Sequence, residues 1–244
     1  MMTGKYKMAD KVIEVISIYP NVHEYCKDYV SDENADFTIK TSQADIEYEQ
    51  KRSDNENICE GKEPVKYSAG YLEELAVYRK IAEKMIDFDT VLFHGSVIAV
   101  DGKGYLFTAK SGTGKSTHTK LWREVFGERA VMVNDDKPLL KITDNQVIAY
   151  GTPYNGKHRI GNNISVPLKA ICILERNPEN IIKKADKTSV YTMLIQQIYR
   201  PADGLKLKRT LELTDKLSEN TDLYVLGCNM DKEAANVAYN GMKD

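Results

Sequence analysis

Glycines, a lysine and hydroxyl side chains are concentrated at residues 109–116, which read Ala-Lys-Ser-Gly-Thr-Gly-Lys-Ser. This run fits the phosphate-loop pattern G-x-x-x-x-G-K-[ST], except that Ala109 replaces the first glycine. Gly112 and Gly114 allow backbone N–H groups to turn toward anionic oxygens, because no Cβ obstructs the approach. We therefore predict a nucleotide-phosphate site formed by Ser111, Gly112, Thr113, Gly114, Lys115, Ser116 and Thr117.

Two side chains of this run can do the charge and metal chemistry of the site. Lys115 supplies a positive charge to the β- and γ-phosphates, and Ser116 offers a hydroxyl ligand to Mg²⁺. The helix expected to begin near Lys115 adds the positive end of its dipole to the same anion. These residue types predict binding of ATP with Mg²⁺, and they do not distinguish ATP from GTP.

Two adjacent carboxylates follow the next apolar segment. Residues 130–133 read Ala-Val-Met-Val, which is typical of a buried strand, and Asn134, Asp135 and Asp136 come directly after it. A phosphate loop needs a hard oxygen ligand for the metal opposite the phosphates. One aspartate can hold Mg²⁺ while the other accepts a proton from an incoming hydroxyl. The sequence does not assign these roles, and alone the pair is also compatible with a turn between strands.

The histidines are weaker candidates. His94 lies in a β-rich segment before the phosphate loop, where a lone histidine is usually structural. His118 falls on the helix after the loop and is expected to face solvent. His23 and His158 lie farther from these motifs in the sequence.

The pattern of apolar residues predicts an α/β fold with a mixed sheet, because helices and strands alternate while hairpins recur. Residues 42–66 are polar and poor in large aliphatic side chains, so we expect a loop-rich connection there. Leu72, Leu75, Tyr78, Ile81 and Met85 recur at helical spacing and predict an amphipathic helix. Further strands are expected at 11–19, 36–41, 90–100, 105–109, 138–142, 146–150, 169–174 and 223–226, and helices at 21–29, 114–126, 189–199, 207–218 and 232–239.

Composition excludes several functional classes. The 244 residues carry a formal net charge of −2, whereas nucleic-acid binders usually show a basic excess. No apolar run approaches the ~18 residues of a transmembrane helix, and the first residues lack the apolar segment of a secretory signal. The four cysteines form no CxxC pair, which favours reduced thiols in a cytoplasmic protein. We therefore expect neither a nucleic-acid nor a membrane partner, and a homo-oligomer stays open.

The order of these motifs resembles the superfamily of HPr kinase/phosphorylase and ATP-dependent phosphoenolpyruvate carboxykinase. The resemblance rests on His94-Gly95, on the segment from Ser111 to Thr117, and on Asp135-Asp136. It extends through residues 151–157, Gly-Thr-Pro-Tyr-Asn-Gly-Lys, which look like the TPW-x-GK segment of small kinase-like relatives, with Tyr154 in place of the tryptophan. It covers roughly residues 88–230.

The resemblance implies a P-loop core of the phosphoenolpyruvate carboxykinase/HPr kinase type with a mixed β-sheet, plus a small N-terminal α/β region. It implies that His94 lies beside the γ-phosphate and the metal, and that Asp135 and Asp136 share metal contact and general base duty. Lys157 and Arg200 become candidate phosphate or substrate clamps, with ordinary surface charges as the alternative. We expect an accessory region at residues 1–70 and the kinase core at residues 71–244.

Three functions fit these observations. The first is an ATP-dependent, Mg²⁺-dependent kinase that transfers the γ-phosphoryl group to a hydroxyl acceptor, either a peptide serine or a small alcohol. In it, His94, Lys115, Asp135 and Asp136 are the catalytic residues, and Ser116 with the aspartates holds the metal. The second is a nucleotide-binding regulatory module or weak ATPase. The third is a carboxykinase-like phosphoryl transfer to an enolate.

Overall fold

The computed structural model describes residues 1–110 and 112–244, so Ser111 lies outside the described residues. The chain divides into two compact units, Met1–Lys84 and Met85–Asp244. The sequence places this boundary between residues 70 and 71, whereas the structure includes most of the amphipathic helix in the first unit. The reason is a set of polar contacts: this helix satisfies backbone groups and carboxylates of the N-terminal segment, as described next.

The first unit is a three-stranded sheet with helices. Its strands are β1 (Met2–Met8), β2 (Lys11–Ser17) and β3 (Phe37–Lys40); β2 pairs antiparallel with β1 and parallel with β3. Its helices are α1 (Asn21–Tyr25), α2 (Gln43–Cys59) and α3 (Ala69–Met85). The buried carboxylate of Glu73 on α3 accepts the backbone N–H groups of Ile18 and Tyr19, both at 2.7 Å.

The expectation of a loop at residues 42–66 is wrong, because α2 occupies most of that segment. The backbone N–H of Ser42 donates to Asp45 Oδ2 at 2.9 Å, which closes the first turn. Arg79 of α3 pairs with the buried Glu49 at 2.6 Å, so α2 is attached by ion pairs rather than by an apolar face. A search for apolar periodicity therefore misses this helix.

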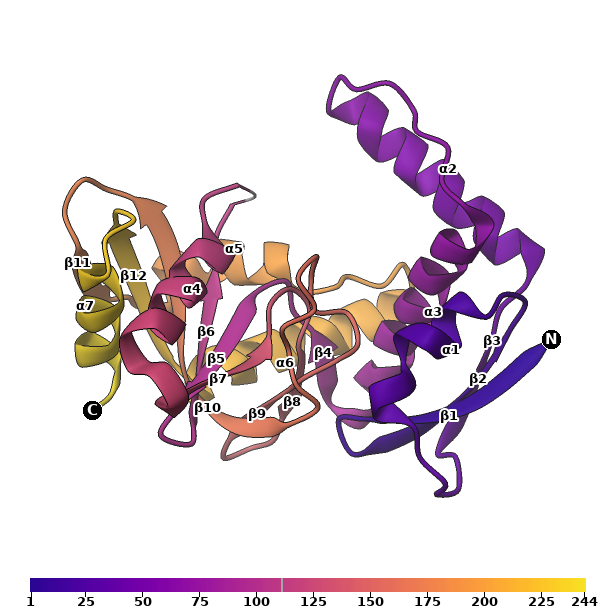
Figure 1. Cartoon of the computed structure of the whole chain (residues 1–244), viewed down its shortest axis with the longest axis horizontal. Coiled ribbons are helices and arrows are strands. Elements are labelled where there is room, and N and C mark those ends of the chain that lie inside the picture. The colour runs from indigo at the N-terminus through magenta and orange to yellow at the C-terminus, as the bar shows by residue number, and fades with distance from the viewer. Residues whose placement is uncertain (111) are drawn as a thin grey trace. The chain divides into compact units, whose positions relative to one another are not determined.

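The second unit contains a nine-stranded mixed sheet (Figure 1), which confirms the predicted α/β class. Strands follow the order β4-β8-β9-β10-β6-β5-β7, and β12 joins both β10 and β11. Strand β10 connects two parts of this sheet, because it pairs antiparallel with β9 and parallel with both β6 and β12. The strands are β4 (Thr90–Leu92), β5 (Ser96–Val100), β6 (Lys103–Thr108), β7 (Ala130–Asn134), β8 (Leu139–Ile142), β9 (Val147–Tyr150), β10 (Ser165–Arg176), β11 (Ile181–Lys184) and β12 (Asp222–Cys228).

Helices cover both faces of the strands around β6 and β10. Helices α4 (Lys115–Phe126) and α7 (Glu233–Met242) pack on the face that includes Tyr105 and Phe107. Helices α5 (Lys187–Gln197) and α6 (Gly204–Asn220) pack on the other face, which includes Leu106. The alternation of these three neighbouring residues is the period of two expected of a strand buried on both sides. No helix in the described part of the chain is long and apolar enough to cross a membrane.

Candidate functional site

The glycine-rich loop predicted to bind phosphates, called the phosphate loop below, connects the end of β6 to the start of α4. Gly112 has φ +75° and Gly114 has φ +120°, backbone conformations that favour glycine. Gly114 is also the N-cap of α4 and forms no side-chain cap, so the first N–H groups of the helix are available to an anion. The predicted sequence of strand, glycine-rich loop and helix is therefore present, with Ser111 outside the described residues.

Two contacts hold the loop in place. The hydroxyl of Thr113 donates to the carbonyl oxygen of Lys110 at 2.8 Å, which closes a local turn. From the end of β10, the guanidinium of Arg176 donates to the carbonyl oxygen of Gly112 at 2.7 Å. The contact of Arg176 could not be predicted, because nothing in the local sequence indicates that the end of β10 lies beside this loop.

Asp135 lies at the end of β7 and is 5% exposed. Its Oδ1 accepts the hydroxyl of Ser96 at 3.1 Å and that of Thr119 at 3.5 Å, and Ser116 is a further hydrogen-bond partner. Burial raises the pKa of Asp135 above its ordinary value, and these hydroxyl donors oppose that rise. The structure thus brings the loop hydroxyl of Ser116 next to a buried carboxylate.

Asp136 is the more accessible member of the pair and faces His94. Oδ1 of Asp136 lies 3.4 Å from His94 Nε2, and both side chains are partly exposed. Burial, and then the charge of Lys115, lower the pKa of His94, while Asp136 opposes them. Burial also lowers the pKa of Lys115, against the attraction of Asp136 and Asp135. These four groups therefore lie within electrostatic reach of one another.

A loop from residue 151 to 157 packs beside the aspartates. A Cβ at Gly156, whose φ is +77°, would lie 3.6 Å from Asp136 Cβ and 3.7 Å from Asp135 Oδ2. Asn134 connects this loop to the strand, because its Nδ2 donates to Thr152 Oγ1 at 3.0 Å and its Oδ1 accepts the N–H of Asp136 at 2.9 Å. The exposed Lys157 follows Gly156 directly. The amino-acid sequence alone does not indicate this positioning role of Asn134.

The segment before Arg200 pairs with the residues around His94. The backbone N–H of His94 donates to the carbonyl oxygen of Gln197 at 2.7 Å, and an antiparallel bridge joins Phe93 to Ile198. The exposed Arg200 lies three residues beyond Gln197, whose side chain is hydrogen-bonded to His94. Gln197 is thus the partner of the histidine that the sequence did not reveal.

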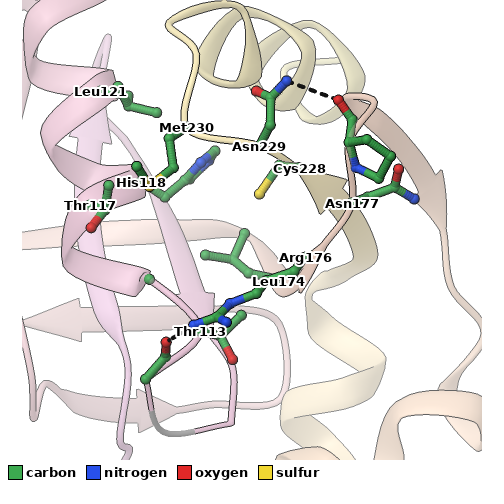
Figure 2. Close-up of a pocket in the computed structure, with 13 residues that line it drawn as sticks. Thr113, Thr117, His118, Leu121, Leu174, Arg176, Asn177, Cys228, Asn229 and Met230 are labelled. Atoms are coloured by element: carbon green, nitrogen blue, oxygen red, sulfur yellow. Dashed lines mark hydrogen bonds between the residues drawn. The ribbon is translucent and has the colours of Figure 1, made fainter.

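Two pockets flank the first turns of α4. A pocket of about 430 Å³ is lined by Ser116, Thr117, Lys120, Arg123, Asp135, His158 and Ile160. A larger pocket of about 660 Å³ extends from the phosphate loop to the ends of β10 and β12 (Figure 2). His118 lines the larger pocket and is 3% exposed, so the expectation that it faces solvent is wrong. It is buried because α4 packs its ring against Phe107, with 4.6 Å between ring centroids.

The donor set at Asp135 fits Mg²⁺. Within residues 1–110 and 112–244, no three His, Cys, Asp or Glu side chains gather as metal ligands. Mg²⁺ is usually held by one or two carboxylates together with substrate phosphates and water, rather than by a cage of protein ligands. Ser116 and Asp135 supply hard oxygens of that kind beside the phosphate loop.

Comparison with known proteins identifies no family. No protein-family model matches the chain, and no curated protein matches it. Among solved structures, the Hpr(Ser) kinase/phosphatase from Coxiella burnetii is similar, with 12% identity and a TM-score of 0.35. The match covers 62% of this chain and 95% of that one. At this TM-score the likeness carries no argument about function, which we therefore infer from the geometry of the site.

Proposed function

We propose that this chain is an ATP-dependent kinase that transfers the γ-phosphoryl group to a hydroxyl acceptor in the presence of Mg²⁺. The observation that carries the proposal is the position of Ser116 at the start of α4, hydrogen-bonded to the buried Asp135 at the end of β7. A loop hydroxyl paired with a strand-end carboxylate is the arrangement that P-loop enzymes use to hold a metal against phosphates.

The different environments of the two aspartates support a division of labour. Asp135 is buried and bonded to hydroxyl groups, which suits a metal ligand, since a cation compensates the unfavourable burial of its charge. Asp136 is partly exposed and lies beside His94, so an acceptor hydroxyl can approach it. We assign Asp135 to the metal and Asp136 to the proton.

The residues of the site account for each part of the transfer. Lys115 and the free N–H groups of α4 bind the β- and γ-phosphates and stabilise the charge of a loose transition state. When bound, Mg²⁺ neutralises charge on the phosphate oxygens. Asp136 accepts the acceptor's proton as the acceptor oxygen bonds to the γ-phosphorus, while the bond to the β-phosphate oxygen breaks and ADP leaves. His94, whose pKa is lowered, is neutral at pH 7 and orients Asp136.

Transfer of label from γ-labelled ATP to serine peptides, small alcohols and water tests the proposal. We expect Lys115→Ala to abolish transfer and to leave the folded structure intact, because the lysine is partly exposed and contributes charge rather than packing. Lys208→Ala is the control, since it removes an exposed lysine from α6. Unchanged transfer in a folded Lys115→Ala protein would exclude the phosphate-loop assignment.

The same experiment separates the other two functions when an enolate is added to the acceptors and Mg·ATP binding is measured by calorimetry. Tight Mg·ATP binding without transfer to any hydroxyl would favour a regulatory module, and slow release of phosphate to water would favour a weak ATPase. Transfer to an enolate but to no alcohol would favour a carboxykinase-like reaction.

A further inference from the structure

The smaller of the two pockets, which borders Asp135, has a surplus of positive charge. Lys120 and Arg123 line it from α4, and His158 lines it from the loop that follows Gly156. Among the described residues that line it, Asp135 is the only one with a carboxylate. Lys120 and Arg123 carry two positive charges against the single negative charge of Asp135, so the lining favours an anionic ligand.

Arg123 is the less exposed of the two cations. Its side chain is partly buried, and in the part of the chain that the structure describes its Nε has no hydrogen-bond partner. Burial raises the pKa of Asp135, and the positive charge of Arg123 is among the influences that lower it, so the two groups lie within electrostatic reach. A guanidinium is always charged, and its planar fork matches a carboxylate or phosphate group. Arg123 is therefore suited to bind such a group at this pocket.

Lys120 is only loosely paired. Its side chain is 66% exposed, and its Nζ lies 3.8 Å from the carboxylate of Glu124. The same carboxylate lies closer to a second cation, because Lys232 Nζ is 3.2 Å from it. An exposed ion pair of this kind contributes little to stability, so Lys120 can turn to a ligand at small cost.

The pocket is next to the residues assigned to phosphoryl transfer. Ser116 and Asp135 belong both to its lining and to the proposed metal site. His158 follows two residues after Gly156, where a Cβ would lie 3.6 Å from Asp136 Cβ. A molecule in this pocket is therefore close to the proposed base. The volume of about 430 Å³ is in the lower part of the range of small-molecule sites.

We propose that this pocket binds the acceptor, and that the acceptor is a small alcohol that carries a phosphate or carboxylate group. The terminal N–H groups of Arg123 and the ammonium group of Lys120 bind that anionic group, and the ring N–H of His158 donates to it. This inference rests on the proposed kinase function and narrows its acceptor to one chemical class. The transfer itself is unchanged: the acceptor oxygen bonds to the γ-phosphorus, its proton goes to Asp136, and ADP leaves.

Matched pairs of acceptors test the need for an anionic group. The pairs are glycerol 3-phosphate with glycerol, and glycerate with glyceramide, each offered to the full-length protein with Mg²⁺ and γ-labelled ATP. We expect kcat/KM to be about 10–100-fold higher for the anionic member of each pair, because charge-assisted hydrogen bonds are made only with it. Equal values within both pairs, or transfer to serine peptides alone, would overturn the pocket and would leave the proposed function in place.

Variants of the lining residues show whether this pocket makes the distinction. The measurement is the ratio of kcat/KM between the anionic and neutral members of a pair, in which any effect on nucleotide binding cancels. We expect Arg123→Gln to lower the ratio about tenfold, and Lys120→Met to lower it about threefold because that lysine is exposed. Arg123→Lys should give an intermediate ratio, since it retains the charge but loses the planar fork.

Lys208→Met is the matched control for Lys120→Met. Lys208 is also an exposed helical lysine that faces a carboxylate four residues later, Glu212 at 4.0 Å, so its ratio should equal that of the parent. A parent-like ratio in both Arg123→Gln and Lys120→Met would overturn the proposal. If Arg123→Gln does not fold, the exposed Lys120→Met still decides. If Mg·ATP binds and no alcohol or peptide is labelled, the proposed function fails, and the acceptor pocket fails with it.

Discussion

Each unit contains buried carboxylates, and Glu73 of the first unit differs from Asp135 of the second in how completely its oxygens are hydrogen-bonded. Glu73, which is 0% exposed, accepts the N–H groups of Ile18 and Tyr19 at 2.7 Å and the hydroxyl of Thr41 at 2.5 Å. Among the described residues, the carboxylate of Asp135 accepts hydrogen bonds from hydroxyl groups, and those from Ser96 and Thr119 are longer, at 3.1 and 3.5 Å.

The difference separates a structural carboxylate from a candidate functional one. Three short hydrogen bonds at Glu73 join α3 to the residues after β2 and to the residue after β3, and they leave little capacity for a ligand. The looser contacts of Asp135 lie beside a pocket and the phosphate loop, so a cation can replace them. A buried polar group with weak hydrogen bonds lowers the free energy of unfolding. Such groups cluster at functional sites, which makes Asp135 the better candidate for a functional role.

Removing the second aspartate should have the largest effect. Asp136→Asn should reduce phosphoryl transfer by about 10²–10⁴-fold with nearly unchanged Mg·ATP affinity, because a general base is lost and the metal ligand remains. Asp135→Asn should instead weaken Mg·ATP binding. Single-turnover transfer and calorimetry on both variants measure the two effects. If both variants only weaken binding, neither aspartate is a dedicated base.

Lowering the pH should reduce the free energy of unfolding through His118, which is buried in its neutral form. Its pKa of about 4 lies below the ordinary value of about 6.5, so the unfolded chain binds its proton more strongly. The free energy of unfolding should therefore fall as the pH decreases from about 6.5 to about 4, by up to about 3 kcal/mol. Urea unfolding across this range checks it, and His118→Gln should show a shallower dependence. Identical slopes in the two proteins would contradict a buried neutral ring.

Glu73→Gln should destabilise the first unit by about 2 kcal/mol, because the new amide N–H₂ faces donors that need an acceptor. Phosphate-loop binding of tripolyphosphate should be unchanged. Chemical denaturation measures the loss, with Glu47→Gln on the exposed side of α2 as the control, expected within about 0.5 kcal/mol of the parent. A loss no larger than that of the control would show that Glu73 is not a structural centre.

The smallest predicted effect is an increase in stability rather than a loss. Asp135→Asn should stabilise the nucleotide-free protein by about 1 kcal/mol near pH 7, because burial raises the pKa of this carboxyl and so disfavours its charge in the folded state. The sign follows from linkage: a raised carboxyl pKa reduces stability as the pH rises through it. Thermal unfolding without nucleotide measures this change. If the variant is strongly destabilised, Asp135 is a structural carboxylate, as Glu73 is.

Local residue types were sufficient to predict the strand, loop and helix around Gly112, Gly114 and Lys115. Their chemistry is local, because φ freedom, helix initiation and charge are properties of consecutive residues. The same holds for the buried strand that ends at Asp135 and for the apolar spacing of α3. Helix α2 was missed because ion pairs with α3, such as Glu49–Arg79, replace the apolar periodicity on which the prediction depended.

Only the tertiary structure decided which distant groups meet. The pairing of segments 92–94 and 197–199 brings Gln197 to His94 and leaves Arg200 three positions along, and the end of β10 brings Arg176 to the phosphate loop. The packing of α4 on β6 buries His118 and leaves its Nδ1 without a hydrogen-bond partner among the residues that the structure describes. The amino-acid sequence determines the chemistry available at each position, whereas strand order and helix packing determine burial and distance, on which pKa values and the geometry of the candidate site depend.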